Sequence, residues 1–287
     1  MSIAYLNGEF VPRDKACVPV MDRGFLFGDS VYEVIPVYGG HLFRLEHHLS
    51  RLDNSLAAIR MANPLPHEAW RGVLRELVGQ RPGEDQSVYL QVTRGPAEKR
   101  DHAIPDVVTP TVFAMTNPLG PIDPAVASDG IAAITLDDLR WQRCDIKATT
   151  LLANVLARQL AKEQGAVEAI LLRDGLALEG AASNLFVFAS GRLVTPPKGP
   201  LLLPGITRDL VIELAQANHI PLSEMDVQAS ALASADEIWL TSSTREVMPV
   251  TRLDGRPVGG GRPGPVWRRM NELYQAYKAH LRQQPDA

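Results

Sequence analysis

The segment Arg140-Trp141-Gln142-Arg143-Cys144-Asp145-Ile146-Lys147 places a lysine immediately before a predicted helix. We expect this helix over about residues 150–164, with Thr149 or Thr150 as its N-cap and Gly165 as its end. Its apolar positions recur at helical spacing and are Leu152, Val155, Leu156 and Leu160. The rest of the chain is best understood from this lysine outward.

Lys147 has neighbours that favour its neutral amine. It precedes the positive end of the predicted helix, and Arg140 and Arg143 lie close to it in sequence. A neutral lysine amine is a nucleophile that condenses with carbonyl compounds. On these residues alone, a solvated loop lysine is the alternative interpretation.

The composition limits the classes to which this chain can belong. The 287 residues are 45% apolar and 22% charged, and the net charge is −4. This length fits two domains of ordinary size. With this weak negative charge, the chain lacks the excess of basic residues that is typical of proteins binding nucleic acid or an acidic membrane surface. We therefore expect small-molecule substrates, no nucleic acid and no membrane among its partners.

The cysteines and the N-terminus indicate a cytoplasmic protein. Cys17 and Cys144 are far apart and lack metal-ligand spacing, so we expect no disulfide framework and no metal site. The first residues are typical of a strand and a turn rather than a signal peptide. The longest apolar runs are too short to span a bilayer.

Strand and helix signals are mixed along the chain, which indicates an α/β fold of the α+β kind. A strand pair with a turn at Asn7-Gly8 opens the chain. The first amphipathic helix carries an apolar stripe of Leu45, Leu49, Leu52, Leu56 and Ile59. Residues 118–124 are dense in proline and form the expected interdomain linker. A small α/β domain over 1–117 and a larger domain over 125–287 follow from this boundary.

Glu179 is a candidate partner for a cationic group. It ends a predicted hairpin that turns at Asp174-Gly175. A carboxylate at the end of a buried strand is costly unless it is paired with a cation. A surface glutamate is the alternative.

Several positions are suited to holding a phosphate. The amides of the first turn of the helix after Gly205 form an anion site, in which Thr207 can also cap. Hydroxyls at a strand end and a guanidinium on the polar side of a helix offer further ligands. These candidate phosphate ligands are Ile206, Thr207, Ser242, Ser243 and Arg51. The alternatives are an ordinary capped helix, a simple turn and a solvated helix face.

Arg100 and His102 form a candidate carboxylate site. Side chains two residues apart in an extended loop point the same way. Arg100 can then bind a carboxylate bidentately while His102 adds a hydrogen bond. An exposed charged loop is the alternative, since Glu98 and Lys99 adjoin the pair.

Taken together, the sequence motifs of this chain resemble those of the fold-type-IV pyridoxal-phosphate enzymes, and among these most of all the D-amino-acid transaminases. The resemblance covers nearly the whole chain. It rests on five ordered motifs: residues 22–33 (DRGFLFGDSVYE), 91–95 (QVTRG), 140–147 (RWQRCDIK), 179–184 (EGAASN) and 205–208 (GITR). It implies a two-domain fold with a smaller N-terminal α/β domain and a larger C-terminal pseudo-barrel α/β domain.

The resemblance also implies a role for each candidate residue. Pyridoxal 5′-phosphate is the cofactor, Lys147 forms the Schiff base with it, and Glu179 pairs with its ring nitrogen. Its phosphate is held by Arg51, Ile206, Thr207, Ser242 and Ser243. The substrate carboxylate is held by Tyr32, Arg100 and His102, the last two reaching across from the second subunit of a homodimer. Two departures from the family pattern are one additional residue between Gly95 and Arg100, and Ala181-Ala182 in place of a serine-rich pair.

The predicted activity is ping-pong transfer of an amino group from a D-amino acid, of the D-alanine or D-glutamate type, to a 2-oxo acid. Lys147 works from one face of the cofactor, so the side on which the carboxylate is held selects the hand of the substrate. Holding it opposite the phosphate predicts D-amino acids. The alternatives are a branched-chain L-amino-acid transaminase or an aminodeoxychorismate lyase on the same scaffold, and a cofactor-free dimeric binding protein.

Overall fold

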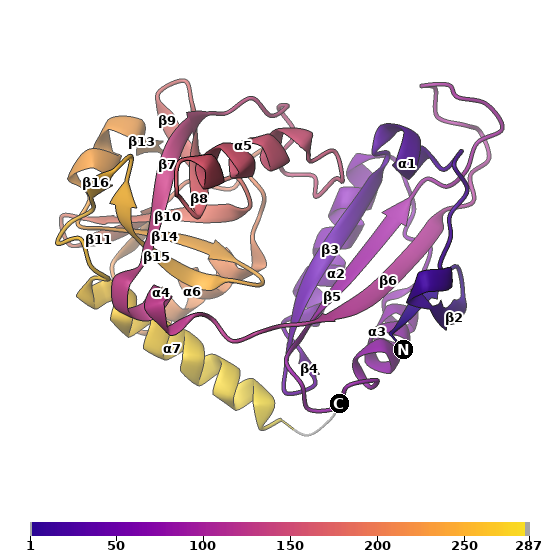
Figure 1. Cartoon of the computed structure of the whole chain (residues 1–287), viewed down its shortest axis with the longest axis horizontal. Helices are drawn as coiled ribbons and strands as arrows, with labels where there is room; N and C mark the ends of the chain where they lie inside the picture. The colour runs from indigo at the N-terminus through magenta and orange to yellow at the C-terminus, as the bar shows by residue number, and fades with distance from the viewer. Residues whose placement is uncertain (1, 285–287) are drawn as a thin grey trace. The chain divides into compact units, whose positions relative to one another are not determined.

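The computed structural model describes residues 2–284, which form two compact units. The first, here the sheet unit, comprises the chain up to Gly120, the segment Ile146–Thr150 and the chain from Leu281. The second, the barrel unit, comprises Pro121–Asp145 and Leu151–His280. Figure 1 traces the chain through both units. A linker over 118–124 stays a prediction.

The sheet unit is built on an antiparallel sheet in the order β2-β1-β6-β5-β3-β4. Its strands are β1 (Ile3–Leu6), β2 (Glu9–Pro12), β3 (Ser30–Tyr38), β4 (His41–Leu42), β5 (Gln86–Thr93) and β6 (Thr111–Pro118). Its helices are η1 (Arg13–Lys15), α1 (Arg23–Phe27), α2 (Leu45–Ala58) and α3 (His67–Val78). The first hairpin turns at Asn7 and Gly8, both with positive φ, as a two-residue hairpin loop requires.

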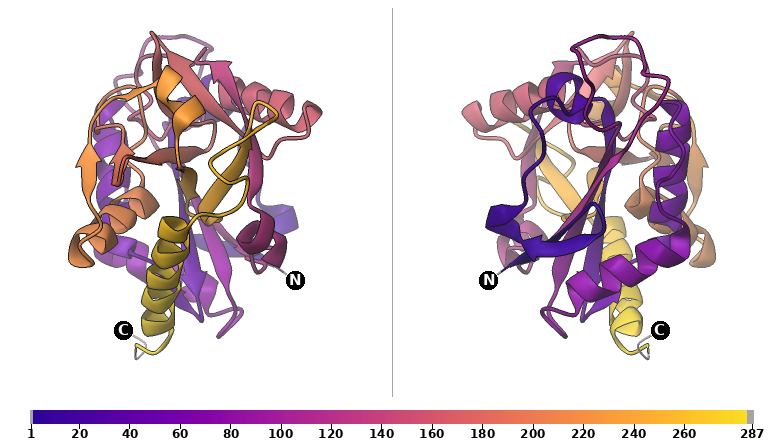
Figure 2. Two further views of the ribbon diagram at one scale, coloured as in Figure 1. Left: turned by 90° about the vertical axis from the view of Figure 1, so that its left-hand side faces the viewer. Right: turned by 90° about the vertical axis from the view of Figure 1, so that its right-hand side faces the viewer.

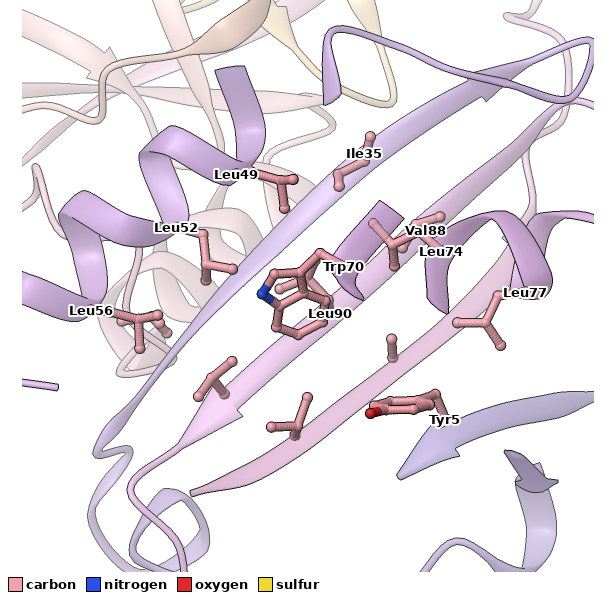
Figure 3. Packing of buried hydrophobic residues seen from close by; sticks show 14 of the residues in the cluster. Tyr5, Ile35, Leu49, Leu52, Leu56, Trp70, Leu74, Leu77, Val88 and Leu90 are labelled. Atoms are coloured by element: carbon pink, nitrogen blue, oxygen red, sulfur yellow. The ribbon is translucent and has the colours of Figure 1, made fainter. Parts of the chain in front are cut away.

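The core of the sheet unit lies between the sheet and two helices. Figures 1 and 2 show α2 and α3 on the same face of the sheet. Leu49, Leu52 and Leu56 reach into this core from α2, as their helical spacing predicted. In Figure 3 they lie along one side of Trp70 of α3, which is fully buried. This packing fixes α2 against β3 and so places the polar residues of α2 described below.

The segment Ile146–Thr150 joins the sheet unit although its neighbours in sequence belong to the barrel unit. It runs beside the start of β3. The Tyr32 amide donates to the carbonyl of Lys147 (3.0 Å), and the Thr149 amide donates to the carbonyl of Ser30 (3.1 Å). The lysine therefore lies on a segment that is bonded to a strand.

The barrel unit contains a ring of six strands. The path β10-β14-β15-β7-β8-β9 is closed by a further pairing of β9 with β10. The strands of the whole barrel unit, within and outside this ring, are β7 (Ile131–Asp137), β8 (Glu168–Arg173), β9 (Leu176–Gly180), β10 (Ser183–Ala189), β11 (Arg192–Thr195), β12 (Leu222–Glu224), β13 (Val227–Gln228), β14 (Glu237–Ser242), β15 (Glu246–Leu253) and β16 (Arg256–Pro257). Its helices are α4 (Pro124–Asp129), α5 (Leu152–Glu163), α6 (Ile206–Ala217), η2 (Ala229–Ser234) and α7 (Pro265–Arg282). The ring confirms the expected α/β class with a C-terminal pseudo-barrel.

Helix α5 ends as predicted but begins differently. Gly165, with φ of 73°, follows its last turn, and the amides of Gly165 and Ala166 donate to carbonyls of that turn, which is the Schellman pattern. The predicted caps Thr149 and Thr150 are wrong, because the N-cap position is Leu151 and no described side chain caps the helix. Thr149 cannot cap it, since its backbone and its hydroxyl are bonded to the start of β3.

The apolar stripe predicted for α5 exists, but it does not face the barrel. Leu152 is 71% exposed and Leu160 is 45% exposed. The helix instead packs on the barrel through Ala157 and Ala161, whose small side chains allow a close approach. Most of an apolar helix face is therefore left on the surface of the single chain.

Among the residues described, no helix combines the length and the apolar character needed to cross a bilayer.

Candidate active site

Lys147 extends over an aromatic ring in the sheet unit. Its Nζ lies 4.3 Å from the centre of the Tyr32 ring. Its neighbours Ile146 and Ala148 are buried in the core of the unit, while Lys147 is half-buried. The Ala148 amide donates to the carbonyl of Ile146 (2.8 Å), so the chain makes a tight turn at Lys147 between these two buried residues. The Lys147 amide donates to the hydroxyl of Ser55 (3.2 Å), which ties the segment to α2 as well as to β3.

Arg51 belongs to a buried polar cluster of three residues. Its Nε and Nη2 each donate to a carboxylate oxygen of Glu33 at 2.7 Å, and Nδ1 of His48 lies 2.7 Å from the same carboxylate. Sequence reasoning placed Arg51 on the polar side of its helix, which is correct, but that side is buried. His48 and Arg51 are three residues apart on one side of the helix, and Glu33 on β3 binds both. That spacing was the available signal for the cluster.

The charges of this cluster are strongly coupled. Burial alone would raise the pKa of Glu33, but the charge and the hydrogen bonds of Arg51 outweigh it and lower the pKa to about 2. Burial lowers the pKa of His48, and the charges of Arg51 and Lys147 lower it further, against the opposing effect of Glu33. The cluster thus holds an ionised carboxylate against a guanidinium, beside a histidine that favours its neutral form.

Arg100 and His102 lie on one loop of the sheet unit, and both contact α1. The Arg100 guanidinium lies 5.0 Å from the centre of the Phe27 ring, and the His102 ring lies 5.2 Å from it. Both side chains are exposed in the single chain. Sequence reasoning assigned no helix to Arg23–Phe27, so it missed this contact.

Glu179 is buried at the end of β9 and accepts hydrogen bonds from several groups. Its Oε1 is bonded to the Arg140 guanidinium, and its Oε2 accepts from the Asn184 amide and the Leu203 backbone amide, each at 3.1 Å. Burial raises the pKa of Glu179 to about 7, although Arg140 and the Leu203 amide act to lower it. A cationic group placed against this carboxylate would favour its ionised form, so the site suits a protonated ring nitrogen.

Three adjacent strands bring Glu179 to a polar row across the barrel. Asn184 on β10 pairs in register with Glu179 on β9 and with Thr241 on β14. The hydroxyl of Thr241 is buried and has no hydrogen-bond partner among residues 2–284. Ser242 and Ser243 follow Thr241 directly, at the end of β14 and in the turn beyond it.

The start of α6 adjoins the same row. The Asn184 amide donates to the carbonyl of Leu203 (2.8 Å), in the loop that leads to Gly205. A side chain on Gly205 would come within 1.8 Å of the Asn184 side-chain oxygen, so only glycine allows this approach. Gly205 is the N-cap residue, and no side chain in the described part of the chain caps α6. Thr207 is therefore not the cap, and its buried hydroxyl has no partner within that part of the chain.

The barrel unit thus brings its predicted residues to one end of neighbouring strands: Glu179, Ile206, Thr207, Ser242 and Ser243. A helix start without a side-chain cap and two unpaired buried hydroxyls are what an anionic group would satisfy. The sheet unit separately places Lys147 over the Tyr32 ring, and Arg51 on Glu33, the next residue of β3. Asn184 was not predicted as a site residue, because only the strand register makes it a neighbour of Glu179 and of Thr241, whose hydroxyl belongs to the predicted run at the end of β14.

Comparison with known proteins identifies the family. The profile of amino-transferase class IV matches residues 30–253. The chain is a class IV aminotransferase. This confirms the family that its motifs resemble, and with it pyridoxal 5′-phosphate as the cofactor.

The relatives of this aminotransferase agree in sequence and in fold. It is 42% identical to a D-alanine aminotransferase of Bacillus licheniformis over 94% of both chains. It is 38% identical to the D-alanine aminotransferase of Staphylococcus aureus (strain COL), over 96% of this chain and 98% of the other. The crystal structure of the branched-chain amino acid aminotransferase of Escherichia coli matches with a TM-score of 0.89 and 28% identity, over 96% of this chain and 94% of that chain. The branched-chain enzyme of the archaeon Thermoproteus uzoniensis, crystallised with norvaline, matches with a TM-score of 0.87 and 26% identity, over 98% and 96%.

Proposed function

We propose that this class IV aminotransferase moves the amino group of a D-amino acid, of the D-alanine or D-glutamate type, to a 2-oxo acid. One observation carries the proposal: a chain 42% identical to a D-alanine aminotransferase has an arginine and a histidine, Arg100 and His102, on one exposed loop. A guanidinium with a neighbouring imidazole suits recognition of a carboxylate.

Lys147 is the proposed catalytic residue. Pyridoxal 5′-phosphate supplies an electron sink for the carbanion that forms when the amino acid loses its α-proton. The Lys147 amine is the group proposed to take that proton from Cα. Its fixed backbone, bonded to β3 and to Ser55, supports this role because a base must be held within reach of the reacting atom.

Five residues are proposed to hold the phosphate of the cofactor: Arg51, Ile206, Thr207, Ser242 and Ser243. The unpaired Thr207 hydroxyl and the α6 start without a side-chain cap support this assignment in the barrel unit. In the sheet unit, the ion pair with Glu33 orients the Arg51 guanidinium. Glu179 is proposed to accept a hydrogen bond from the ring nitrogen, with Arg140 keeping the carboxylate in place.

Tyr32, Arg100 and His102 are proposed to bind the substrate carboxylate. Lys147 acts from one face of the cofactor, so the position of the carboxylate decides which enantiomer presents its α-proton to the amine. A carboxylate bound by this trio, opposite the phosphate, selects D-amino acids. A carboxylate bound on the phosphate side would select L-amino acids.

A homodimer is part of the proposal, with Arg100 and His102 acting in the site of the partner subunit. The apolar stripe of α5 supports it, since large exposed apolar surfaces mark interaction sites. The loop after Arg100 also exposes apolar side chains, with Val107 86% exposed. A reducing cytoplasmic location remains the expectation for a chain in which Cys17 and Cys144 are free thiols.

A comparison of amino donors tests the reaction. Purified holoenzyme is supplied with D-alanine, D-glutamate, L-leucine or (R)-phenylethylamine, with and without 2-oxoglutarate or pyruvate as acceptor. We expect turnover of the D-amino acids that requires the acceptor. Preference for L-leucine would indicate the branched-chain activity of the structural relatives. Pyruvate release from aminodeoxychorismate without any acceptor would indicate a lyase.

Subunit mixing tests the shared site. Lys147→Ala and Arg100→Ala homodimers are each expected to be nearly inactive. Random assembly after co-expression makes about half of the dimers mixed, and each mixed dimer has one intact site if the arginine acts across the interface. The whole preparation should then recover about a quarter of the activity of the natural enzyme. No recovery in mixed dimers that have been shown to form would contradict a shared site.

A further inference from the structure

Arg23 of α1 is a buried arginine that the proposed reaction does not use. Only 4% of its surface is exposed. A buried guanidinium is stable only when its charge is paired and its N–H groups are bonded. The partners of Arg23 therefore indicate what it does in the fold.

The Arg23 guanidinium binds the backbone of the loop that carries Arg100 and His102. Its Nη1 donates to the carbonyl of Asp101 at 2.6 Å and to that of Ala103 at 3.2 Å. Its Nη2 donates to the carbonyl of His102 at 3.3 Å. Three consecutive carbonyls, nearly eighty residues away in sequence, thus meet one rigid planar group.

The other side of the guanidinium is anchored. Nε of Arg23 donates to the Asp29 carboxylate at 2.8 Å. Arg94 donates to both oxygens of the same carboxylate, with hydrogen bonds of 2.7 and 3.0 Å. The remaining Arg94 contacts are to the carbonyls of Ile59 and Arg60, which lie outside the loop. Asp29 therefore fixes both arginines, but only Arg23 reaches residues 101–103.

Phe27 extends the same support to the side chains. Its ring centre lies 4.9 Å from the Arg23 guanidinium, 5.0 Å from that of Arg100 and 5.2 Å from the His102 ring. Cations over an aromatic face are attracted to it. The loop is thus held by its backbone through Arg23 and by its two functional side chains through Phe27.

We propose that Arg23 is a positioning residue for carboxylate recognition: it fixes the backbone of residues 101–103 and so sets where Arg100 and His102 present their side chains. This inference rests on the proposed role of those two residues in binding the substrate. Lysine cannot replace Arg23, because a single ammonium cannot span three carbonyls and the Asp29 carboxylate at once.

The test compares Arg23→Lys with Arg94→Lys in the holoenzyme. Both variants weaken a contact of similar burial to Asp29, so both report the cost of disturbing this ion cluster. We expect Arg23→Lys alone to raise KM for D-alanine, by about 10-fold to 100-fold, as for a misplaced binding group. The kcat should change little, which is the pattern of lost uniform binding. The bound cofactor content should be the same in both variants.

Limited proteolysis gives a readout that does not depend on turnover. Trypsin can cleave after Lys99 and Arg100, next to the fixed carbonyls. We expect faster cleavage there in Arg23→Lys than in Arg94→Lys or the natural enzyme. Phe27→Leu, which leaves the Asp29 contacts intact, should also raise KM for D-alanine. This second variant still tests the support of the loop if Arg23→Lys does not fold.

Arg100→Ala distinguishes failure of the proposed carboxylate site from failure of the positioning role of Arg23. If this variant binds D-alanine as the natural enzyme does, the proposed carboxylate site is wrong, whatever Arg23 does. If Arg100→Ala raises KM while Arg23→Lys matches Arg94→Lys in KM and in cleavage rate, the positioning role alone is refuted. An unchanged KM in Phe27→Leu would show that the Phe27 ring does not help to position Arg100 and His102.

Discussion

Replacing Glu33 by glutamine is expected to destabilise the sheet unit and weaken cofactor binding. The glutamine would keep the shape of the side chain but remove its charge from a fully buried site. The amide oxygen of glutamine could accept only one of the two hydrogen bonds that Arg51 makes to the carboxylate, and its NH2 group would face the other Arg51 N–H or Nδ1 of His48. Breaking one member of a buried ion pair leaves an uncompensated charge in a medium of low polarity.

The size of the effect follows from the pKa of Glu33. The difference between its ordinary value of 4.5 and its value of about 2 in the folded chain corresponds to about 3 kcal/mol of stability. Removal of one partner from a buried ion pair costs about 3–5 kcal/mol in other proteins, which is of the same order.

The pH dependence has a definite sign. Because folding lowers the pKa of Glu33, its contribution is complete above pH 4.5 and is lost as the pH falls toward 2. The gap in stability between the natural protein and Glu33→Gln should be constant from about pH 8 to pH 5 and should narrow below pH 4.5.

The assay is urea unfolding followed through Trp70, the buried tryptophan of the sheet unit. Glu46→Gln is a matched control, because Glu46 also binds an arginine through two oxygens and approaches a histidine, but it is exposed. Exposed pairs contribute little, so this control should unfold like the natural protein. An equal loss of stability in both variants would refute the argument from burial. The affinity for pyridoxal 5′-phosphate should fall only in Glu33→Gln.

Three further predictions concern the proposed site. Lys147→Ala should lower the transamination rate by at least about 10²–10⁴-fold and abolish the yellow colour that borohydride removes; normal turnover in it would overturn the assignment. Burial raises the pKa of Glu179 to about 7, so in cofactor-free protein its ionisation disfavours the folded state. The stability of Glu179→Gln relative to the natural chain should therefore increase by about 3 kcal/mol between pH 4.5 and about pH 8. A difference in the free energy of unfolding that does not change with pH, measured by urea titration, would contradict this. Thr207→Val removes an unpaired buried hydroxyl, so the cofactor-free melting temperature should not fall, while the Kd for pyridoxal 5′-phosphate should rise by several-fold, roughly one hydrogen bond. A lower melting temperature with unchanged Kd would show that the hydroxyl serves the fold instead.

Local signals in the sequence predicted the elements well where the physics is local. The Asn7-Gly8 turn and the Gly165 helix end need only the conformational freedom of glycine and its neighbours. The apolar stripe of α2 needs only helical periodicity, and the structure confirms it as a core face. The stripe of α5 has the same periodicity and yet lies exposed, because periodicity shows that a face is apolar and does not show what covers it.

The family was also contained in the sequence, since related chains keep the same motifs in the same order. The partners of the site side chains were not. Glu33 becomes a partner of Arg51 only when α2 packs on β3, and Thr241 becomes a neighbour of Asn184 only through strand register. Arg23 reaches the loop of His102 only because the fold closes a separation of nearly eighty residues. Buried charges and hydroxyls pair with groups that are close in space, whatever their separation in sequence, so the tertiary structure alone decided how the site residues are held.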